Sequence, residues 1–153
     1  MLRSDLPIAL PMMQAVGYAD TAGVDCDQAP ADILFFIVPF KCIVLLAGLL
    51  VTEACAGATT TPVMKFDRRI TAGSDTGRGD GDIANFILGT TAAGKILYDK
   101  AAVGTVLMPG DEVVAELTVR ATGTGAAGHV RPFLLVQYDP EVMANLPDMI
   151  ETT

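Results

Sequence analysis

The stretch that most constrains how this chain can fold runs from residue 109 to residue 138 and reads PGDEVVAELTVRATGTGAAGHVRPFLLVQY. Apolar residues occupy every second position of its first half, the side-chain period of a β-strand with one buried face. A Pro-Gly-Asp turn signal precedes this strand, and a glycine-rich segment separates it from a second β-rich run over 130–138. We therefore expect two strands joined by a hairpin loop. The apolar positions of the first strand are Val113, Ala115, Leu117 and Val119.

Other short runs indicate further strands, over 33–38 and 63–71 and within 94–108. The apolar run over 42–52 fits either a strand buried on both faces or a short helix, and its Val and Ile content favours the strand. Residues 83–88 are either a short helix capped by Asp82 or a strand. Seven or eight short strands with turns every 8–12 residues or so predict an all-β fold, a single antiparallel jelly-roll or β-sandwich domain.

The length of 153 residues predicts one domain. We expect an extended N-terminal arm over 1–32, the β-sandwich over 33–140 and a C-terminal tail over 141–153. Prolines interrupt the arm, yet it is apolar, so it should lie on its own domain or on a neighbouring subunit. The domain should fold without residues 1–20 but lose its partner. The residues expected at an interface are Leu6, Ile8, Leu10, Met12 and Met13 of the arm and Met143, Leu146, Met149 and Ile150 of the tail.

The composition points to a chain with extensive apolar surface. Apolar residues make up 51% of the sequence and charged residues only 18%, against about 25% in an average soluble domain. A membrane or a wide protein interface would account for this excess. The run over 33–51 contains Pro39, Lys41 and Gly48, which argues against a membrane span. Ten basic residues against 18 acidic ones give a net charge of −8 and argue against a nucleic-acid partner.

The three cysteines are Cys26, Cys42 and Cys55, an odd number without CxxC spacing. This pattern predicts buried free thiols in a reducing compartment rather than a disulfide framework. His129 is the only histidine, so a zinc site is not expected, and the sequence pairs it with no catalytic partner. We expect no catalytic, cofactor-binding or metal-binding residue and no enzymatic activity.

Three local motifs have ordinary explanations. The loop containing Asp75, Asp80 and Asp82 could bind calcium, but its spacing differs from that of an EF-hand, and a solvated loop explains it. Residues 78–80 spell the integrin-recognition tripeptide Arg-Gly-Asp, which three residues readily match by chance. The segment GTGAAG is followed by a strand, whereas a phosphate-binding loop would lead into a helix.

The motif LMPGDEVVAELTVRATGTGAAGHVRPFLLVQYDPE, the short strands and the apolar arm together resemble the head decoration (cement) proteins of bacteriophages. The resemblance covers about residues 33–140. It implies a small acidic β-sandwich or jelly-roll protein on the outer face of a virion capsid, made in the host cytoplasm. The implied partners are the major capsid protein and further copies of the chain, as a homotrimer. The family offers no catalytic or cofactor residue to transfer.

Other functions fit the same pattern. The chain could be another phage structural component, such as a head fibre, a tail protein or a capsid protein. A jelly-roll carbohydrate-binding or metal-binding protein of the cupin kind is a different class, which the single histidine disfavours. A small membrane protein built on residues 33–51 is the third alternative.

Overall fold

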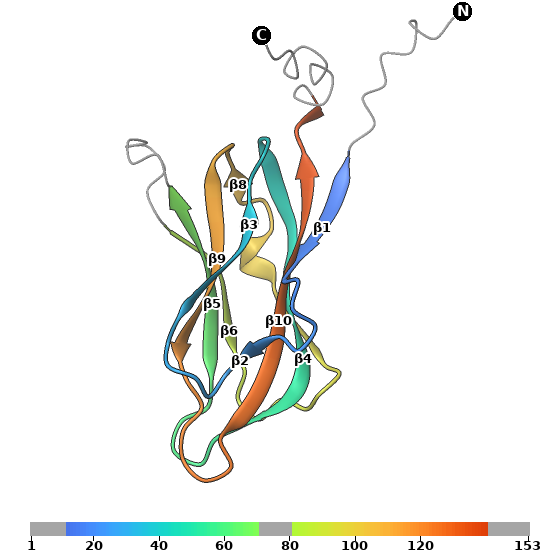
Figure 1. Ribbon diagram of the computed structural model, residues 1–153. Helices are drawn as coiled ribbons and strands as arrows, with labels where there is room; N and C mark the ends of the chain where they lie inside the picture. Colours follow the sequence, from blue (N-terminus) through green and yellow to red (C-terminus); the bar gives the residue numbers. More distant parts are fainter. Residues whose placement is uncertain (1–11, 71–80, 141–153) are drawn as a thin grey trace, which may run out of the picture.

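Two antiparallel β-sheets packed face to face make up the described part of the chain, and the expected all-β sandwich is confirmed (Figure 1). The structure is a computed structural model, and it describes residues 12–70 and 81–140. The described residues form ten strands and one short 3-10 helix, η2 (Lys100–Ala102).

The six-stranded sheet is built on two long neighbouring strands, β4 and β10. Short strands flank them: β1 and β2 pair with β10 on one side, and β7 and β8 pair with β4 on the other. These strands are β1 (Met13–Gly17), β2 (Val24–Asp25), β4 (Cys42–Ala56), β7 (Ile96–Asp99), β8 (Val106–Leu107) and β10 (Ala127–Tyr138).

The four-stranded sheet covers one face of the first, with strand order β3-β9-β5-β6. Its strands are β3 (Asp32–Ile37), β5 (Val63–Ile70), β6 (Gly81–Ile87) and β9 (Asp111–Val119). The run over 42–52 is a strand, as favoured, and it continues to Ala56. Residues 83–87 belong to a strand and not to the alternative helix.

The expected hairpin over 109–138 is wrong. Both of its strands exist, but β9 lies in the four-stranded sheet and β10 in the six-stranded sheet, so the glycine-rich segment crosses from one layer to the other. The β4–β5 connection makes the same crossing, and the two loops lie side by side at the lower end of Figure 1. Hydroxyl oxygens of Thr60 and Thr122 are 2.6 Å apart between them. Alternation identifies a buried face but does not say which strand is the neighbour.

The turn that precedes β9 follows its sequence signal. Asp111 N–H donates to the Met108 carbonyl at 3.0 Å, and Gly110 between them has a φ of 87°. Proline at the second position and glycine with positive φ at the third are the pattern of a type II turn.

Part of the expected arm belongs to the six-stranded sheet. β1 and β2 lie within residues 1–32, and both pair with β10 of the same chain. Val16 and Tyr18 pack against the buried core. Removing residues 1–20 would therefore remove an edge strand and uncover core side chains, contrary to the expectation that the domain folds without them.

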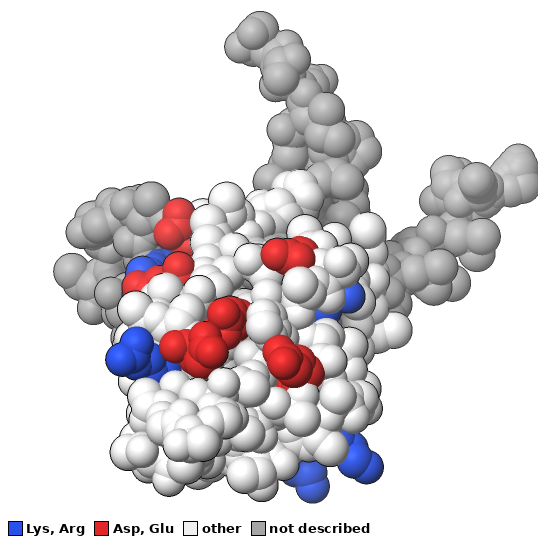
Figure 2. Space-filling model, turned by 60° about the horizontal axis from the view of Figure 1, so that its bottom comes forward, with Lys and Arg blue, Asp and Glu red and all other residues white. Residues whose placement is uncertain are grey.

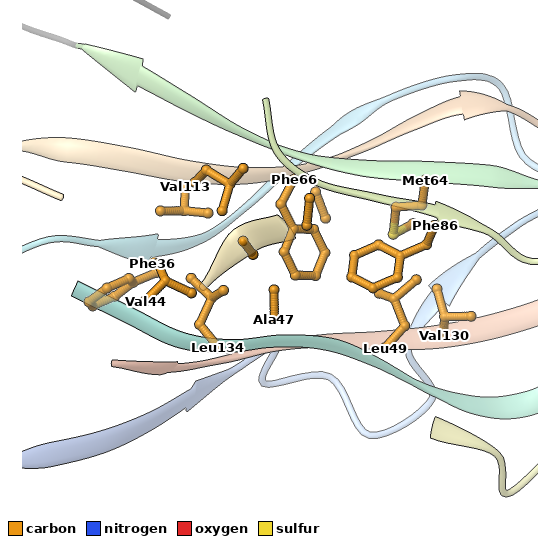
Figure 3. Close-up of a cluster of buried hydrophobic side chains, with 14 of the residues drawn as sticks. Phe36, Val44, Ala47, Leu49, Met64, Phe66, Phe86, Val113, Val130 and Leu134 are labelled. Carbon is orange, nitrogen blue, oxygen red and sulfur yellow. The ribbon is translucent and has the colours of Figure 1, made fainter. Parts of the chain in front are cut away.

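The core lies between the two sheets, as Figure 3 shows. Met64, Phe66 and Phe86 reach into it from the four-stranded sheet, and Leu49 and Leu134 from the six-stranded sheet. The ring centroids of Phe66 and Phe86 are 5.0 Å apart, and the Phe66 side chain is fully buried. Aromatic side chains of this size contribute much of the apolar area that folding removes from water.

We expect Phe66→Ala to lower the free energy of unfolding by about 3–5 kcal/mol, because it leaves a cavity between the sheets. Urea unfolding followed by circular dichroism measures this loss. Ile87→Ala is the matched control, since Ile87 is 76% exposed, and its change should stay within about 0.5 kcal/mol. Equal losses for the two variants would contradict the packing described here.

Candidate functional site

The outer faces of the two sheets differ in chemistry. On the four-stranded sheet, Lys65 Nζ lies 3.1 Å from Asp82 Oδ1 and 3.3 Å from Glu116 Oε2. Arg69 Nη2 lies 2.5 Å from Asp32 Oδ2. The hydrogen bonds that Lys65 donates to the carboxylates of Asp82 and Glu116 raise its pKa. This face carries charges of both signs close together, as expected of a solvated surface.

The outer face of the six-stranded sheet is largely apolar. Cross-strand partners have side chains on the same face, and the register therefore defines rows of outward side chains. We call the outward apolar side chains of β1, β4, β7, β8 and β10 the apolar face. Its residues are Met13, Ala15, Ile43, Leu46, Leu50, Ile96, Tyr98, Val106, Phe133 and Leu135.

A glycine at the centre of the apolar face lets two aromatic rings meet there. Gly48 is the register partner of both Phe133 and Tyr98. A Cβ placed on Gly48 would lie 2.4 Å from the Phe133 ring, so any other residue would displace this ring. The two rings are 6.4 Å apart in an edge-to-face arrangement. The missing side chain at Gly48 on β4 thus leaves room for the Tyr98 ring of β7 and the Phe133 ring of β10.

The apolar face is incompletely covered by the described residues. Met13 is 61% exposed, Tyr98 54% and Ile96 45%, while Phe133 and Leu135 are half-buried. Four strands about 4.8 Å apart and about seven residues long give a footprint of about 450 Å². The largest apolar patch on a typical monomer is about 300–600 Å² and often functional. A face of this size, without a charge at its centre, is suited to contact with another polypeptide.

The cavity at one end of the apolar face offers little for catalysis. It has a volume of about 260 Å³ and lies between β4, β8 and the end of β10. Its charged lining residues pair with each other, with Lys41 Nζ 3.3 Å from Asp139 Oδ2. Most pockets for small ligands are larger, about 300–1,000 Å³.

The opposite end of the six-stranded sheet is acidic. In Figure 2, several Asp and Glu side chains lie across the middle of the face that is turned forward. Here His129 lies between Asp25 on β2 and Glu53 on β4, and its Nδ1 pairs with Glu53 Oε2. Nearby, a hydrogen bond with Asp25 and the Asp25 charge raise the pKa of Asp27. His129 thus has a carboxylate partner that sequence spacing did not reveal.

The structure places only two of the nine expected interface residues. Met13 lies in the apolar face, and the exposed Met12 accepts a hydrogen bond from Tyr138 N–H at its carbonyl. The other seven, Leu6, Ile8, Leu10, Met143, Leu146, Met149 and Ile150, lie outside the described residues. Sequence reasoning missed the outward residues of β4, β7, β8 and β10. The signal was available, since the run over 42–52 is apolar on both faces.

Other sequence expectations have mixed outcomes. All three cysteines are free and buried, as expected. Asp82 pairs with Lys65, while Asp75 and the tripeptide over 78–80 lie outside the described residues. Within 12–70 and 81–140, no group of three or more His, Cys, Asp or Glu side chains could hold a metal ion.

The same ranges contain no helix that is both long and apolar enough to cross a membrane.

Comparison of the chain with protein-family models, with curated proteins and with solved structures found no match.

The Asp25–Asp27 contact predicts a pH dependence of stability. The pKa of Asp27 is higher in the folded chain than in the unfolded chain, where an ordinary Asp has a pKa of about 3.9. Above that pH the unfolded chain releases the Asp27 proton more readily than the folded chain, so ionisation of Asp27 opposes folding. Stability is therefore lost as the pH rises through the raised pKa. We expect Asp27→Asn to melt at a higher temperature than the wild type at pH 7, and at the same temperature below about pH 3.

Thermal melts across this pH range test the effect. Asp20→Asn removes one negative charge from a neighbouring loop without touching the Asp25–Asp27 contact, so it controls for net charge. A constant difference between Asp27→Asn and wild type at all pH values would contradict the assignment.

Proposed function

We propose that this chain is a structural virion protein that binds the outer surface of a phage capsid and stabilises contacts between capsomers, as a homotrimer. The observation that carries the proposal is the apolar face, which the described chain does not cover. The major capsid protein is the proposed partner, and the resemblance of the sequence to decoration proteins supports this choice. No chemical step is required of such a protein.

The charge distribution supports a protein partner. The centre of the apolar face lacks charged side chains, so a partner covers it without desolvating charges, which is the costly part of burial. Interface cores are depleted of charged residues and enriched in aromatic residues and methionine. Tyr98, Phe133 and Met13 match this composition. The acidic end beside β2 would favour a neutral or basic surface on the shell.

The size of the apolar face suggests that other segments of the chain contribute to the proposed interface. A standard interface buries about 800 Å² on each partner, and the face supplies about half of this. Met13 begins β1 at the edge of the face, and Pro140 ends the described chain at the cavity beside it. Residues 1–11 and 141–153 continue from these two positions, so their apolar residues are proposed to contribute the remainder.

Tyr98→Asp should weaken binding to capsid shells at least tenfold, which corresponds to about 1.4 kcal/mol, because it places a charge in the apolar face. Co-sedimentation with shells of the major capsid protein from the same virus measures this affinity. Ile37→Asp is the matched control, since Ile37 is a similarly exposed apolar strand residue on the other sheet. It should bind like the wild type. Equal affinities for all three proteins would rule out the apolar face as the contact.

Removing residues 1–11 should leave the domain folded, because all ten described strands and the buried core residues are retained, but it should lower the occupancy of shells. Removing residues 1–20 should in addition lower the melting temperature, because it deletes β1. Thermal melts and shell occupancy by electron microscopy separate the two effects. Full occupancy by the protein lacking residues 1–11 would exclude its part in binding. Failure of the complete chain to bind any shell would overturn the proposed function.

A further inference from the structure

β1 forms one edge of the six-stranded sheet, and no strand in the described part of the chain pairs with its outer side. Figure 1 shows it at the right of the sheet, beside β10. All of its residues are exposed except Val16, which is half-buried. An exposed strand edge is a place where the strand of another chain can add to the sheet.

The hydrogen bonds to β10 show which backbone groups of β1 face outward. The Met12 carbonyl accepts from Tyr138 N–H, and Tyr18 N–H donates to the Pro132 carbonyl, each at 2.9 Å. Both bonds involve even-numbered residues of this segment, and alternate residues of an antiparallel ladder point their backbone groups to opposite sides. The odd-numbered residues of β1 therefore point N–H and C=O away from β10. These residues are Met13, Ala15 and Gly17.

β1 lacks the features that commonly keep an edge strand from pairing with another chain. Its sequence, Met-Gln-Ala-Val-Gly, contains no charge and no proline, and its register with β10 has no bulge. The edges of the other sheet are protected. A register shift interrupts the β3 ladder after Leu34, and Asn85 N–H of β6 donates to the Asp99 carboxylate at 2.8 Å. The edge of β1 is thus suited to pair with a further strand.

We propose that β1 pairs antiparallel with β1 of a second copy of the chain, across a two-fold axis centred on Ala15. This pairing joins the two six-stranded sheets edge to edge. The contact uses the same surface on both copies and joins them in twos, so in a homotrimer it would connect one trimer with the next. The inference goes beyond the proposed function and does not depend on binding to a shell.

The sequence of β1 fits a second copy of itself in this register. Ala15 lies opposite Ala15 of the second copy, and Met13 lies opposite its Gly17. The large outward side chain thus meets a residue without a side chain, and the two small ones meet each other. Because the three outward residues of each strand face those of the other, every outward N–H and C=O of both strands gains a partner.

The pairing also joins the two apolar faces. Residues directly opposite each other in an antiparallel pair have side chains on the same face, and Met13 and Ala15 belong to the apolar face. Two footprints of about 450 Å² make a joined face of about 900 Å². One partner contributes about 800 Å² to a standard interface. The pair of copies therefore offers a contact of standard size, which a single copy does not.

Cysteine cross-linking tests the register. Ala15→Cys places a thiol opposite its own copy, and opposite Cα atoms in a hydrogen-bonded antiparallel pair are about 5.5 Å apart, within the reach of a disulfide. Met13→Cys is the matched control, because Met13 lies on the same edge and face and is 61% exposed. In the proposed register the two copies of residue 13 are about 14 Å apart, too far for a disulfide.

Under oxidation by diamide, Ala15→Cys should form a cross-linked dimer at least about tenfold faster than Met13→Cys. The wild type should remain uncross-linked, because its three cysteines are buried. Equal rates for the two variants, or no dimer from Ala15→Cys, would overturn the proposal.

Proline substitution tests the hydrogen bonds between the two copies. Ala15→Pro removes an N–H that faces away from β10, so the variant should melt like the wild type. Its self-association, measured by analytical ultracentrifugation, should be at least about tenfold weaker. Ala15→Ser keeps the N–H and should associate like the wild type. Wild-type association of the proline variant would show that this edge is not the contact.

The alternative occupant of the β1 edge is the N-terminal segment of a second copy. The protein lacking residues 1–11 distinguishes the two, because it retains β1. In this shortened protein, Ala15→Cys should cross-link at the same rate as in the complete chain. Loss of the cross-link would assign the edge to the N-terminal segment and refute the pairing of β1 with itself. Because no shell is used, these results are independent of whether the chain binds a capsid.

Discussion

The pairing of β4 with β10 is the interaction on which the rest of the structure depends. These two strands are the longest in the described chain, and they are paired from Cys42–Tyr138 at one end to Ala56–Ala127 at the other. Every other strand of the six-stranded sheet is short and attaches to one of them. Because the two strands are about 85 positions apart in sequence, their pairing closes a long loop, which is entropically costly and slow to form. Leu49 and Leu134 offset this cost by burying apolar area against the second sheet.

The second sheet completes the core without covering the first sheet on both sides, and this leaves the apolar face uncovered by the described residues. Inward residues of β4 and β10 meet Phe66, Phe86 and their neighbours, and water is excluded there. Outward residues of the same strands face no other layer among the described residues. Asp99 ties the sheets at one side: its carboxylate accepts from Asn85 N–H on β6 and from Ala101 N–H in η2, each at 2.8 Å. The apolar face therefore lies on a braced sheet, and a rigid surface loses little entropy on binding.

The sequence predicted the class of the fold and the position of most strands, because alternation and turn residues are local signals. Glu112–Arg120 and the turn before it are examples, although Val119 proves to be 38% exposed. It could not predict strand neighbours, so β9 and β10 were expected to be a hairpin and are in different sheets. The composition did predict a wide apolar surface, but it pointed to the terminal segments rather than to the middle of a sheet.

The distribution of charge then limits how a partner can approach. The net charge of −8 opposes contact between two acidic surfaces, since like charges repel over about 8 Å at physiological ionic strength. On the outer sheet face, His129 lies at the β2 end and Arg131 lies beside Leu50 at the border of the apolar face, while Lys41 and Asp139 pair at the other end. Between these ends, contact displaces water mainly from apolar side chains, with the uncharged Gln137 beside Met13 and Ile43. On the four-stranded sheet, contact would instead require the desolvation of Lys65, Arg69 and their carboxylate partners. This difference in desolvation cost favours docking through the apolar face, and the proposed binding to a repeating shell would require such a preferred orientation.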